Sequence, residues 1–226
     1  MKAIKIDIVS DIACPWCAIG YARLERALQG LNDEVSANIE WHAFELNPEP
    51  NLTPEPILPA LAHKYGRPEA DIQASQAQMT DVATALGLNF SKMQTRYTTN
   101  TFDAHRLVKW AATQSTEHPS GNAQTAMKLA LFEAYFGDAL NMAEQETLLA
   151  CVKSAGLNVA AATEVLNSDS YADAVRADEQ AYQQAGVNAV PAFIIGRDDG
   201  KKYLISGAQE AKTLENAIRD IANQVA

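Results

Sequence analysis

The sequence predicts an α/β protein whose mixed sheet is assembled from the two ends of the chain, with a helical block inserted between them. Strand-like alternation is confined to residues 3–46 and 190–206. Between about residues 58 and 185 the apolar residues recur at helical spacing instead. A proline-rich break over residues 47–59 separates the first strands from that helical block.

At the N-terminal end, alternating isoleucines predict a strand over residues 3–9. Lys5 and Asp7 oppose the isoleucines, so the second face of this strand is less apolar than that of a typical central parallel strand. Apolar residues at helical spacing over residues 19–31 predict a helix. Residues 38–46 then predict a second strand.

Amphipathic stretches fill the inserted block, over residues 72–86, 104–112, 127–135, 148–155 and 171–185. Glycines placed just after the last two are typical of helix ends.

Residues typical of β-strands occur again near the C-terminal end. Residues 190–195 and 202–206 predict a hairpin joined by the turn signal at residues 198–200. Apolar residues between 214 and 225 predict a closing helix. We therefore expect a discontinuous sheet domain of residues 1–52 plus 187–226, and a helical insertion subdomain of residues 53–186.

Composition narrows the function classes. The chain has 226 residues, 47% of them hydrophobic, and a formal net charge of −10. Nucleic acids and anionic membranes bind basic surfaces, so neither is expected as a partner. No apolar run approaches the ~20 residues of a membrane span, and the alternating N-terminus does not resemble a signal peptide. We expect a cytoplasmic protein.

Cys14-Pro15-Trp16-Cys17 follows the first predicted strand and opens the first helix. Pro15 suits the first helical position, so N–H groups of the first turn can point at the Cys14 sulfur. Together with the helix dipole, they favour a thiolate, and such motifs have pKa values of roughly 3.5–7.5. Cys17, one turn into the helix, is expected to be more buried and to act as the resolving thiol.

Two structural explanations of this CxxC pair compete with redox chemistry. A structural zinc site needs four ligands, usually including a second close Cys or His pair, and the sequence has none. Two inert buried thiols are the other explanation, and a proline between them at a helix start argues against it. We therefore predict a redox-active dithiol and no metal or cofactor.

Val190-Pro191 is the second candidate element, because proline at the start of a strand removes a ladder donor. A cis bond here would expose the Val190 backbone to an extended peptide beside the dithiol. The residues alone favour the trans alternative, because only ~5–6% of X–Pro bonds in folded proteins are cis.

Three further residues have two interpretations each, and a fourth has one. His105 and Arg106 lie beside the apolar stripe of a predicted helix, where they either line a groove over the dithiol or play structural roles. Asp11 either tunes the dithiol or shapes a turn. Cys151 lies on an apolar stripe and is predicted to be an inert core residue.

Motifs along almost the whole chain resemble the FrnE branch of the DsbA-like thioredoxin superfamily. They are residues 10–17, 100–107, 131–136, 186–187, 190–193 and 206–209. The resemblance implies a thioredoxin fold with a large inserted helical subdomain, and disulfide oxidoreductase activity. It also implies that Pro191 occupies the cis-proline position facing the CxxC pair.

We therefore expect a thiol–disulfide oxidoreductase in which Cys14 attacks and Cys17 resolves. Pro191 completes the catalytic set, and Pro15, Trp16, Val190, His105 and Arg106 are the candidate substrate-binding residues. Protein disulfides, small-molecule disulfides and glutathione are the candidate partners.

Two other classes remain open. The related 2-hydroxychromene-2-carboxylate isomerases and kappa-class glutathione transferases share the fold, but typically carry serine at the Cys14 position. A non-enzymatic binding protein or chaperone would leave the Cys14–Cys17 pair unexplained.

Overall fold

The computed structural model describes residues 1–114, 122–197 and 199–224. The expected turn residue Asp198 and the last residue of the expected closing helix, Val225, lie outside these ranges. No helix in the described ranges combines the length and apolar character needed to cross a membrane.

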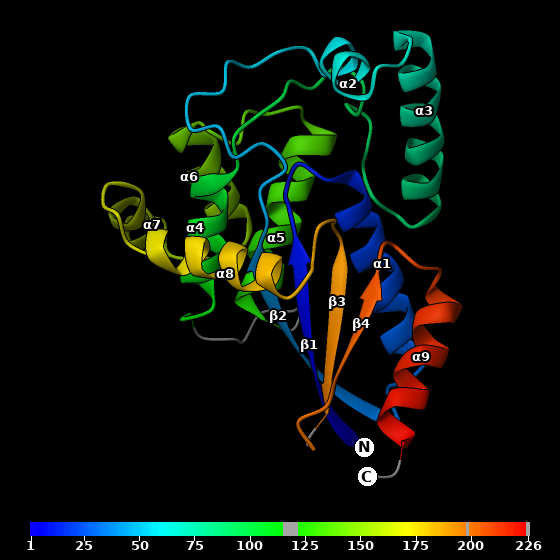
Figure 1. Cartoon of the computed structure of the whole chain (residues 1–226). Helices are drawn as coiled ribbons and strands as arrows, with labels where there is room; N and C mark the ends of the chain where they lie inside the picture. Colours follow the sequence, from blue (N-terminus) through cyan, green and yellow to red (C-terminus); the bar gives the residue numbers. More distant parts are fainter. Residues whose placement is uncertain (115–121, 198, 225–226) are drawn as a thin grey trace.

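A mixed sheet forms the centre of the molecule (Figure 1). Its strands are β1 (Lys2–Ser10), β2 (Val35–Ala43), β3 (Ala192–Arg197) and β4 (Lys202–Ser206), in the order β2-β1-β3-β4. Strands β1 and β2 are parallel, whereas β3 is antiparallel to both β1 and β4. The predicted assembly of one sheet from both chain ends is confirmed.

The second strand begins and ends three residues earlier than predicted. Pairing along the full length of β1, from Lys2 opposite Val35 to Ser10 opposite Ala43, sets its limits. Residues 44–46 carry apolar character, but they have left the ladder and lead toward the active-site region. Hydrophobic pattern alone does not mark where strand pairing stops.

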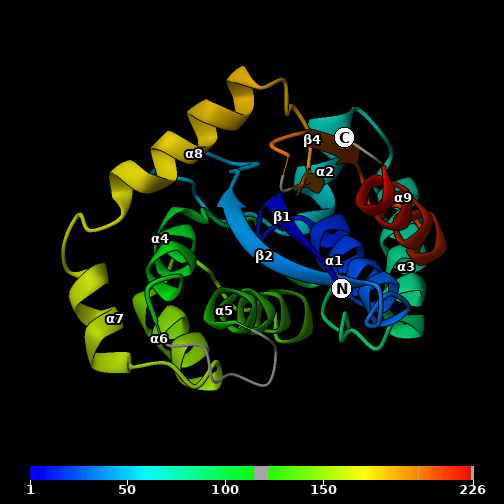
Figure 2. The ribbon, with the colours of Figure 1, turned by 90° about the horizontal axis from the view of Figure 1, so that it is seen from below.

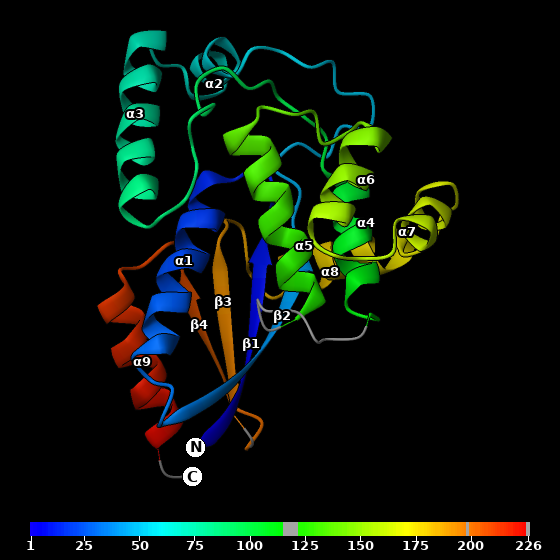
Figure 3. The same cartoon turned by 180° about the vertical axis from the view of Figure 1, so that it is seen from behind.

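Helices α1 (Pro15–Gln29) and α9 (Ala211–Asn223) pack side by side on one face of the sheet, as the view from behind shows (Figure 3). The alternating isoleucines of β1 are buried on this face with Leu24 of α1 and Leu214 of α9. Period-2 and period-3.6 patterns therefore meet in one core, as the sequence predicts.

The inserted residues are mostly helical. The helices are α2 (Ile57–Tyr65), α3 (Glu69–Ala85), α4 (Phe102–Ala111), α5 (Ala123–Phe132, continued by the π-helical turn Glu133–Gly137), α6 (Gln145–Ser154), α7 (Val159–Leu166) and α8 (Ala172–Gln184). The sequence analysis missed α2 and α7. Helix α2 begins inside the predicted proline-rich break, because a proline in the first turn of a helix loses no hydrogen bond. Helix α7 has eight residues, which give too short a stripe for periodicity to reveal. The α/β class with inserted helices is confirmed. The domain boundaries at residues 52 and 187 stay a prediction.

Helix α8 lies across the opposite face of the sheet from α1 and α9 (Figure 2). On this face the sequence places the polar side chains of Lys5 and Asp7. Charged side chains that are largely shielded from water hold the helix there. The Asp178 carboxylate of α8 accepts a hydrogen bond from the Ala43 N–H at 3.1 Å, and its Oδ1 lies 3.2 Å from His42 Nδ1. Lys109 Nζ lies 2.5 Å from Asp178 Oδ2.

The pKa of Asp178 reflects these contacts. Burial would raise this pKa, but hydrogen bonds with His42 and Lys109 outweigh it and hold the pKa below its ordinary value. The carboxylate is therefore ionised at neutral pH, and the stability it contributes is lost only as the pH falls through its folded pKa.

Replacing Asp178 with alanine should lower the free energy of unfolding by about 2–4 kcal/mol, because it leaves His42 and Lys109 without their shared partner. Urea denaturation at pH 7 measures this difference. The gap between variant and wild type should narrow as the pH falls from about 4, the ordinary aspartate pKa in the unfolded chain, through the lower pKa of Asp178 in the folded protein. Asp173→Ala, at an exposed position of the same helix, is the control and should change stability by less than about 1 kcal/mol. Equal effects of the two variants would contradict the interpretation.

Candidate active site

The CxxC pair lies where the end of β1 turns into α1. Cys14 is the residue before the helix, with extended backbone angles (φ −93°, ψ 112°), and Pro15 takes the first helical position. Cys17 is one turn inside the helix and completely buried, whereas Cys14 retains 6% of its surface. The local sequence thus presents one sulfur to the outside and hides the other.

The two thiols have opposite acidities. Hydrogen bonds from the Cys17 thiol and from the backbone N–H groups of Cys17 and Trp16 lower the pKa of Cys14, although burial opposes them. Burial, reinforced by the neighbouring Cys14, raises the pKa of Cys17 well above its ordinary value. Cys14 is therefore the thiol that ionises first, and its role as the nucleophile stays a prediction.

The Val190-Pro191 bond is cis, as the resemblance implied. Cys14 Sγ lies 3.7 Å from the carbonyl oxygen of Val190, so the loop before β3 faces the dithiol directly. The α1 helix packs closely on Pro191. A Cβ at Gly20 would lie only 3.0 Å from Pro191 Cγ, so a larger residue at Gly20 would push the helix away from the proline.

Asp11 is completely buried beneath the dithiol and joins three parts of the chain. Its carboxylate accepts hydrogen bonds from the backbone N–H groups of Ala13 (3.2 Å) and Leu46 (2.7 Å) and from the Thr101 hydroxyl (2.8 Å). His105 Nε2 lies 3.4 Å away, without the alignment of a hydrogen bond. Burial would raise the pKa of Asp11, but the close approach of His105 and these hydrogen bonds hold it below its ordinary value.

Lys128 of α5 is the second buried charge in this region. Its Nζ is 3.4 Å from the Ser10 carbonyl and 5.5 Å from the ring centres of Trp41 and Phe132. Burial lowers the pKa of Lys128 to about 8, although the nearby Cys17 opposes the shift. The positive charge of Lys128 in turn lowers the pKa of Cys17 and so offsets part of the increase that burial causes.

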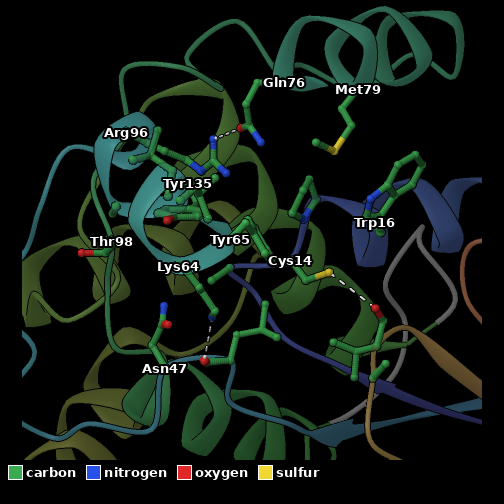
Figure 4. Close-up of a pocket in the computed structure, with 18 of the residues that line it drawn as sticks. Cys14, Trp16, Asn47, Lys64, Tyr65, Gln76, Met79, Arg96, Thr98 and Tyr135 are labelled. Atoms are coloured by element: carbon green, nitrogen blue, oxygen red, sulfur yellow. Dashed lines mark hydrogen bonds between the residues drawn. The ribbon is translucent and has the colours of Figure 1, made fainter. Parts of the chain in front are cut away.

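A cavity of about 530 Å³ opens beside Cys14 (Figure 4). Its walls come from the start of α1, the loop after β2, helices α2 and α3, and the Val190 loop. Arg96, in the segment between α3 and α4, and Tyr135 form the wall on the far side from the Val190 loop. The volume is within the range of small-molecule sites.

The predicted substrate-binding residues fall into two groups. Pro15, Trp16 and Val190 line the cavity, and Trp16 is 41% exposed at its edge. His105 and Arg106 are not among its lining residues. His105 is buried against Asp11, and burial lowers the pKa of its imidazole.

Arg106 has a structural environment. It forms an ion pair with Asp103 at 2.7 Å and donates hydrogen bonds to the carbonyls of Val165, Ser168 and Ser170. It therefore ties α4 to the connection between α7 and α8. Its predicted contact with substrate stays a prediction that this geometry does not favour.

Sequence reasoning did not find Arg96, Lys64 or Lys128. In the sequence, each has the pattern of an exposed residue, because a single basic residue in a loop or on a helix does not show that it is buried or lines a cavity. Cys151, by contrast, is buried in the core, and burial raises its pKa to about 11, in keeping with the predicted inert thiol.

One group of potential metal ligands occurs in the described ranges, formed by Asp7, Glu40 and His42. Lys5 Nζ already lies 2.9 Å from Asp7 and 2.6 Å from Glu40. This cationic neighbour occupies both carboxylates, so the group is an ion-pair network of the sheet's polar face.

With this geometry established, comparison with known proteins identifies the family. The model of the DSBA-like thioredoxin domain family matches residues 5–219, and the chain belongs to that family. The fold is therefore the DsbA-like thioredoxin fold. At this level the family supports an oxidoreductase or isomerase.

Individual proteins agree with the family assignment. The crystal structure of a probable DsbA oxidoreductase from Streptomyces coelicolor is similar at 32% identity and a TM-score of 0.87, covering 99% of this chain and 92% of that one. The uncharacterized protein YwbO of Bacillus subtilis (strain 168) is 29% identical over 96% of each chain.

Two more distant structures share the fold alone. A 2-hydroxychromene-2-carboxylate isomerase has 15% identity and a TM-score of 0.65, over 97% of both chains. The cytosolic disulfide reductase DsbM from Pseudomonas aeruginosa, solved with GSH, has 14% identity and a TM-score of 0.62, over 96% of both chains.

Iodoacetamide at pH 6–7 should alkylate Cys14 of the reduced protein at least about tenfold faster than Cys17 or Cys151, because each unit of pKa difference changes the thiolate fraction about tenfold. Mass spectrometry of a digested time course measures all three rates in one sample. Denatured protein is the control and should show similar rates at all three cysteines. Similar rates in the native protein would contradict the assigned asymmetry.

Proposed function

We propose that this protein is a thiol–disulfide oxidoreductase that exchanges disulfides through the Cys14–Cys17 dithiol. The observation that carries the proposal is the asymmetry of the pair. The acidic thiol lies at the start of α1 beside a cavity, and the second thiol is buried one helical turn behind it. Nucleophilic exchange needs both features, because one sulfur must be accessible and the other must stay protonated until it is used.

In the reducing direction, the Cys14 thiolate attacks one sulfur of a substrate disulfide. A mixed disulfide forms, and the other substrate sulfur leaves as a thiolate. The Cys17 thiol then loses its proton and attacks the Cys14 sulfur, so the second substrate sulfur leaves and the Cys14–Cys17 disulfide closes. Two electrons pass from the dithiol to the substrate, and the protons of the two cysteines balance those of the two product thiols.

Buried charges support the second step. Cys17 must ionise in an environment that disfavours its anion, and the cationic Lys128 is the nearby group that lowers its pKa. The negative Asp11 acts on Cys14 in the opposite sense and keeps its pKa from falling further. A Cys14 thiolate that is moderately stable both attacks and leaves readily, which suits a reversible exchange.

The Val190 carbonyl supports a substrate-positioning role for the cis-proline loop. As a thiol, Cys14 donates toward this oxygen at 3.7 Å. Once Cys14 is in a mixed disulfide it has no proton to donate, and the carbonyl is free to accept an N–H group from a substrate lying along the loop. Pro191 holds Val190 in this position against α1.

The alternative is a glutathione-dependent isomerase or transferase. The fold likeness to a 2-hydroxychromene-2-carboxylate isomerase and the cavity beside Cys14 favour it. Such chemistry needs no resolving thiol, and Cys17 distinguishes the two proposals. The likeness to DsbM, solved with GSH, makes glutathione a candidate thiol partner under either one. The FrnE branch and a cytoplasmic location stay predictions.

Single cysteine variants test the proposal. Cys14→Ser should lower the rate of disulfide exchange with bis(2-hydroxyethyl) disulfide by about 10³-fold or more, because the nucleophile is lost. Cys17→Ser should instead accumulate a mixed disulfide at Cys14, visible as an added mass that a reductant removes. Cys151→Ser is the matched control, and its exchange rate should equal that of the wild type.

Three results would contradict the exchange mechanism. They are full exchange activity in Cys14→Ser, rapid turnover without an adduct in Cys17→Ser, and a disulfide that joins Cys151 to either active-site cysteine. An intact isomerase or transferase activity in Cys17→Ser would favour the glutathione-dependent alternative.

A further inference from the structure

The cavity beside Cys14 differs in charge from the rest of the molecule. The chain has 28 acidic and 18 basic residues, yet within the described ranges the lining includes Arg96 and Lys64 and no acidic side chain. The other polar lining groups include Asn47, Gln76 and Tyr135, which are uncharged at neutral pH. An acidic protein has therefore kept a positively charged cavity at its reactive thiol.

Arg96 is the more informative of the two cations. It is 2% exposed, and no carboxylate in the described ranges lies within ion-pair distance of its guanidinium. Its Nη1 donates to Gln76 Oε1 at 3.0 Å and to the Met93 carbonyl, but its Nε has no partner among the described residues. Burial lowers the pKa of Arg96, and Tyr135 and the Cys14 thiolate offset only part of this effect. A buried cation with no directly paired carboxylate is costly, and proteins normally pair such groups.

Aromatic rings compensate only part of this charge. The guanidinium carbon of Arg96 lies 5.3 Å from the Tyr135 ring centre and 5.1 Å from that of Phe136. Such contacts orient the guanidinium but do not neutralise it. Its free donor capacity and its charge are available to an anion that enters the cavity.

Lys64 is an exposed residue of α2 and supplies the second charge. Its Nζ lies at the weak distance of 3.5 Å from the Leu46 carbonyl, which leaves the ammonium able to turn toward a ligand. Figure 4 shows Lys64, Tyr65 and Asn47 on one side of the cavity and Arg96 with Gln76 on another, with Cys14 within reach of the space between them.

We propose that this cavity is an anion-binding subsite in which Arg96 and Lys64 hold a carboxylate of the substrate, and that small carboxylate-bearing disulfides are the substrate class. This inference rests on the proposed exchange function and specifies its substrate. Cys14 keeps 6% of its surface exposed, and the cavity of about 530 Å³ beside it has the volume of a small-molecule site.

The carboxylate takes no part in the electron transfer. Cys14 attacks the substrate sulfur nearer to it, a sulfur–sulfur bond forms, and a carboxylate-bearing thiolate leaves. Cys17 then displaces the second thiolate and closes the Cys14–Cys17 disulfide. The dithiol is oxidised by two electrons, one disulfide becomes two thiols, and the cationic groups serve only to position the substrate.

The test compares three disulfides of similar length: 3,3′-dithiodipropionate (dianionic), bis(2-hydroxyethyl) disulfide (neutral) and cystamine (dicationic). Stopped-flow tryptophan fluorescence at low ionic strength measures how fast each oxidises the reduced protein. Each rate constant is divided by that of dithiothreitol with the same compound, which removes intrinsic reactivity. The normalised rate should be at least about tenfold higher for the dianion than for the neutral compound, as expected for charge-assisted contacts.

Matched variants assign this preference to the two residues. Lys64→Gln should reduce the dianion preference about threefold, because an exposed pair contributes little. Arg96→Gln should reduce the dianion preference by about tenfold or more, because the charge of Arg96 is removed from water. The readout is the ratio of the dianion rate to the neutral rate in each variant, because this ratio removes any general effect of the substitution on the dithiol. Lys153→Gln, at an exposed position of α6, is the control for net charge.

Each result supports or overturns the inference. Equal normalised rates for the three disulfides, or a preference for cystamine, would overturn the subsite while leaving the exchange function intact. An anion preference that Lys153→Gln reduces as much as Lys64→Gln would also overturn it. If Arg96→Gln does not fold, an unchanged preference in Lys64→Gln is sufficient to reject the proposal. No oxidation by any of the three compounds would reject the exchange function itself.

Discussion

The buried carboxylate of Asp11 is the interaction on which the active region depends. It accepts hydrogen bonds from the turn that leads into the CxxC helix, from Leu46 in the segment after β2, and from Thr101 at the start of α4. These three segments are remote in sequence, and one of them belongs to the inserted helical block. A single ion completely removed from water thus joins the sheet to the helices above it. Its cost in desolvation is offset only while all of these donors stay in place.

The same carboxylate sets the electrostatic balance of the dithiol. The N-terminus of α1 and the neighbouring Cys17 thiol stabilise a Cys14 anion, whereas Asp11 opposes it. Lys128 acts in the other direction on Cys17. Both charges are buried, so water screens their effects weakly. The α1 helix therefore supplies the asymmetry between the two thiols, and the buried charges beneath it moderate that asymmetry from both sides.

The inserted helices do more than cover the dithiol. They contribute Arg96, Lys64 and Tyr135 to the wall of a cavity that the Val190 loop also lines. The Arg96 side chain in this wall is 2% exposed and has no carboxylate partner in the described ranges. The inserted helical block therefore contributes charge as well as shape to the cavity. In the proposed function, the thioredoxin fold positions the sulfurs and the inserted helices determine which substrates reach them.

The sequence by itself determined the α/β class, the sheet built from both chain ends, the hairpin of residues 190–195 and 202–206 and the position of the CxxC pair. These features depend on local periodicity and on proline and cysteine spacing, which a single sequence displays. It did not determine the limits of β2, the existence of α2 and α7, or the environments of Arg96 and Lys128. Those depend on strand pairing, burial and the distances between remote segments. In a single sequence, a lysine or arginine is expected to lie at the surface. Only the tertiary structure shows that it is buried, and its charge acts strongly on a thiol or a ligand because little water screens it there.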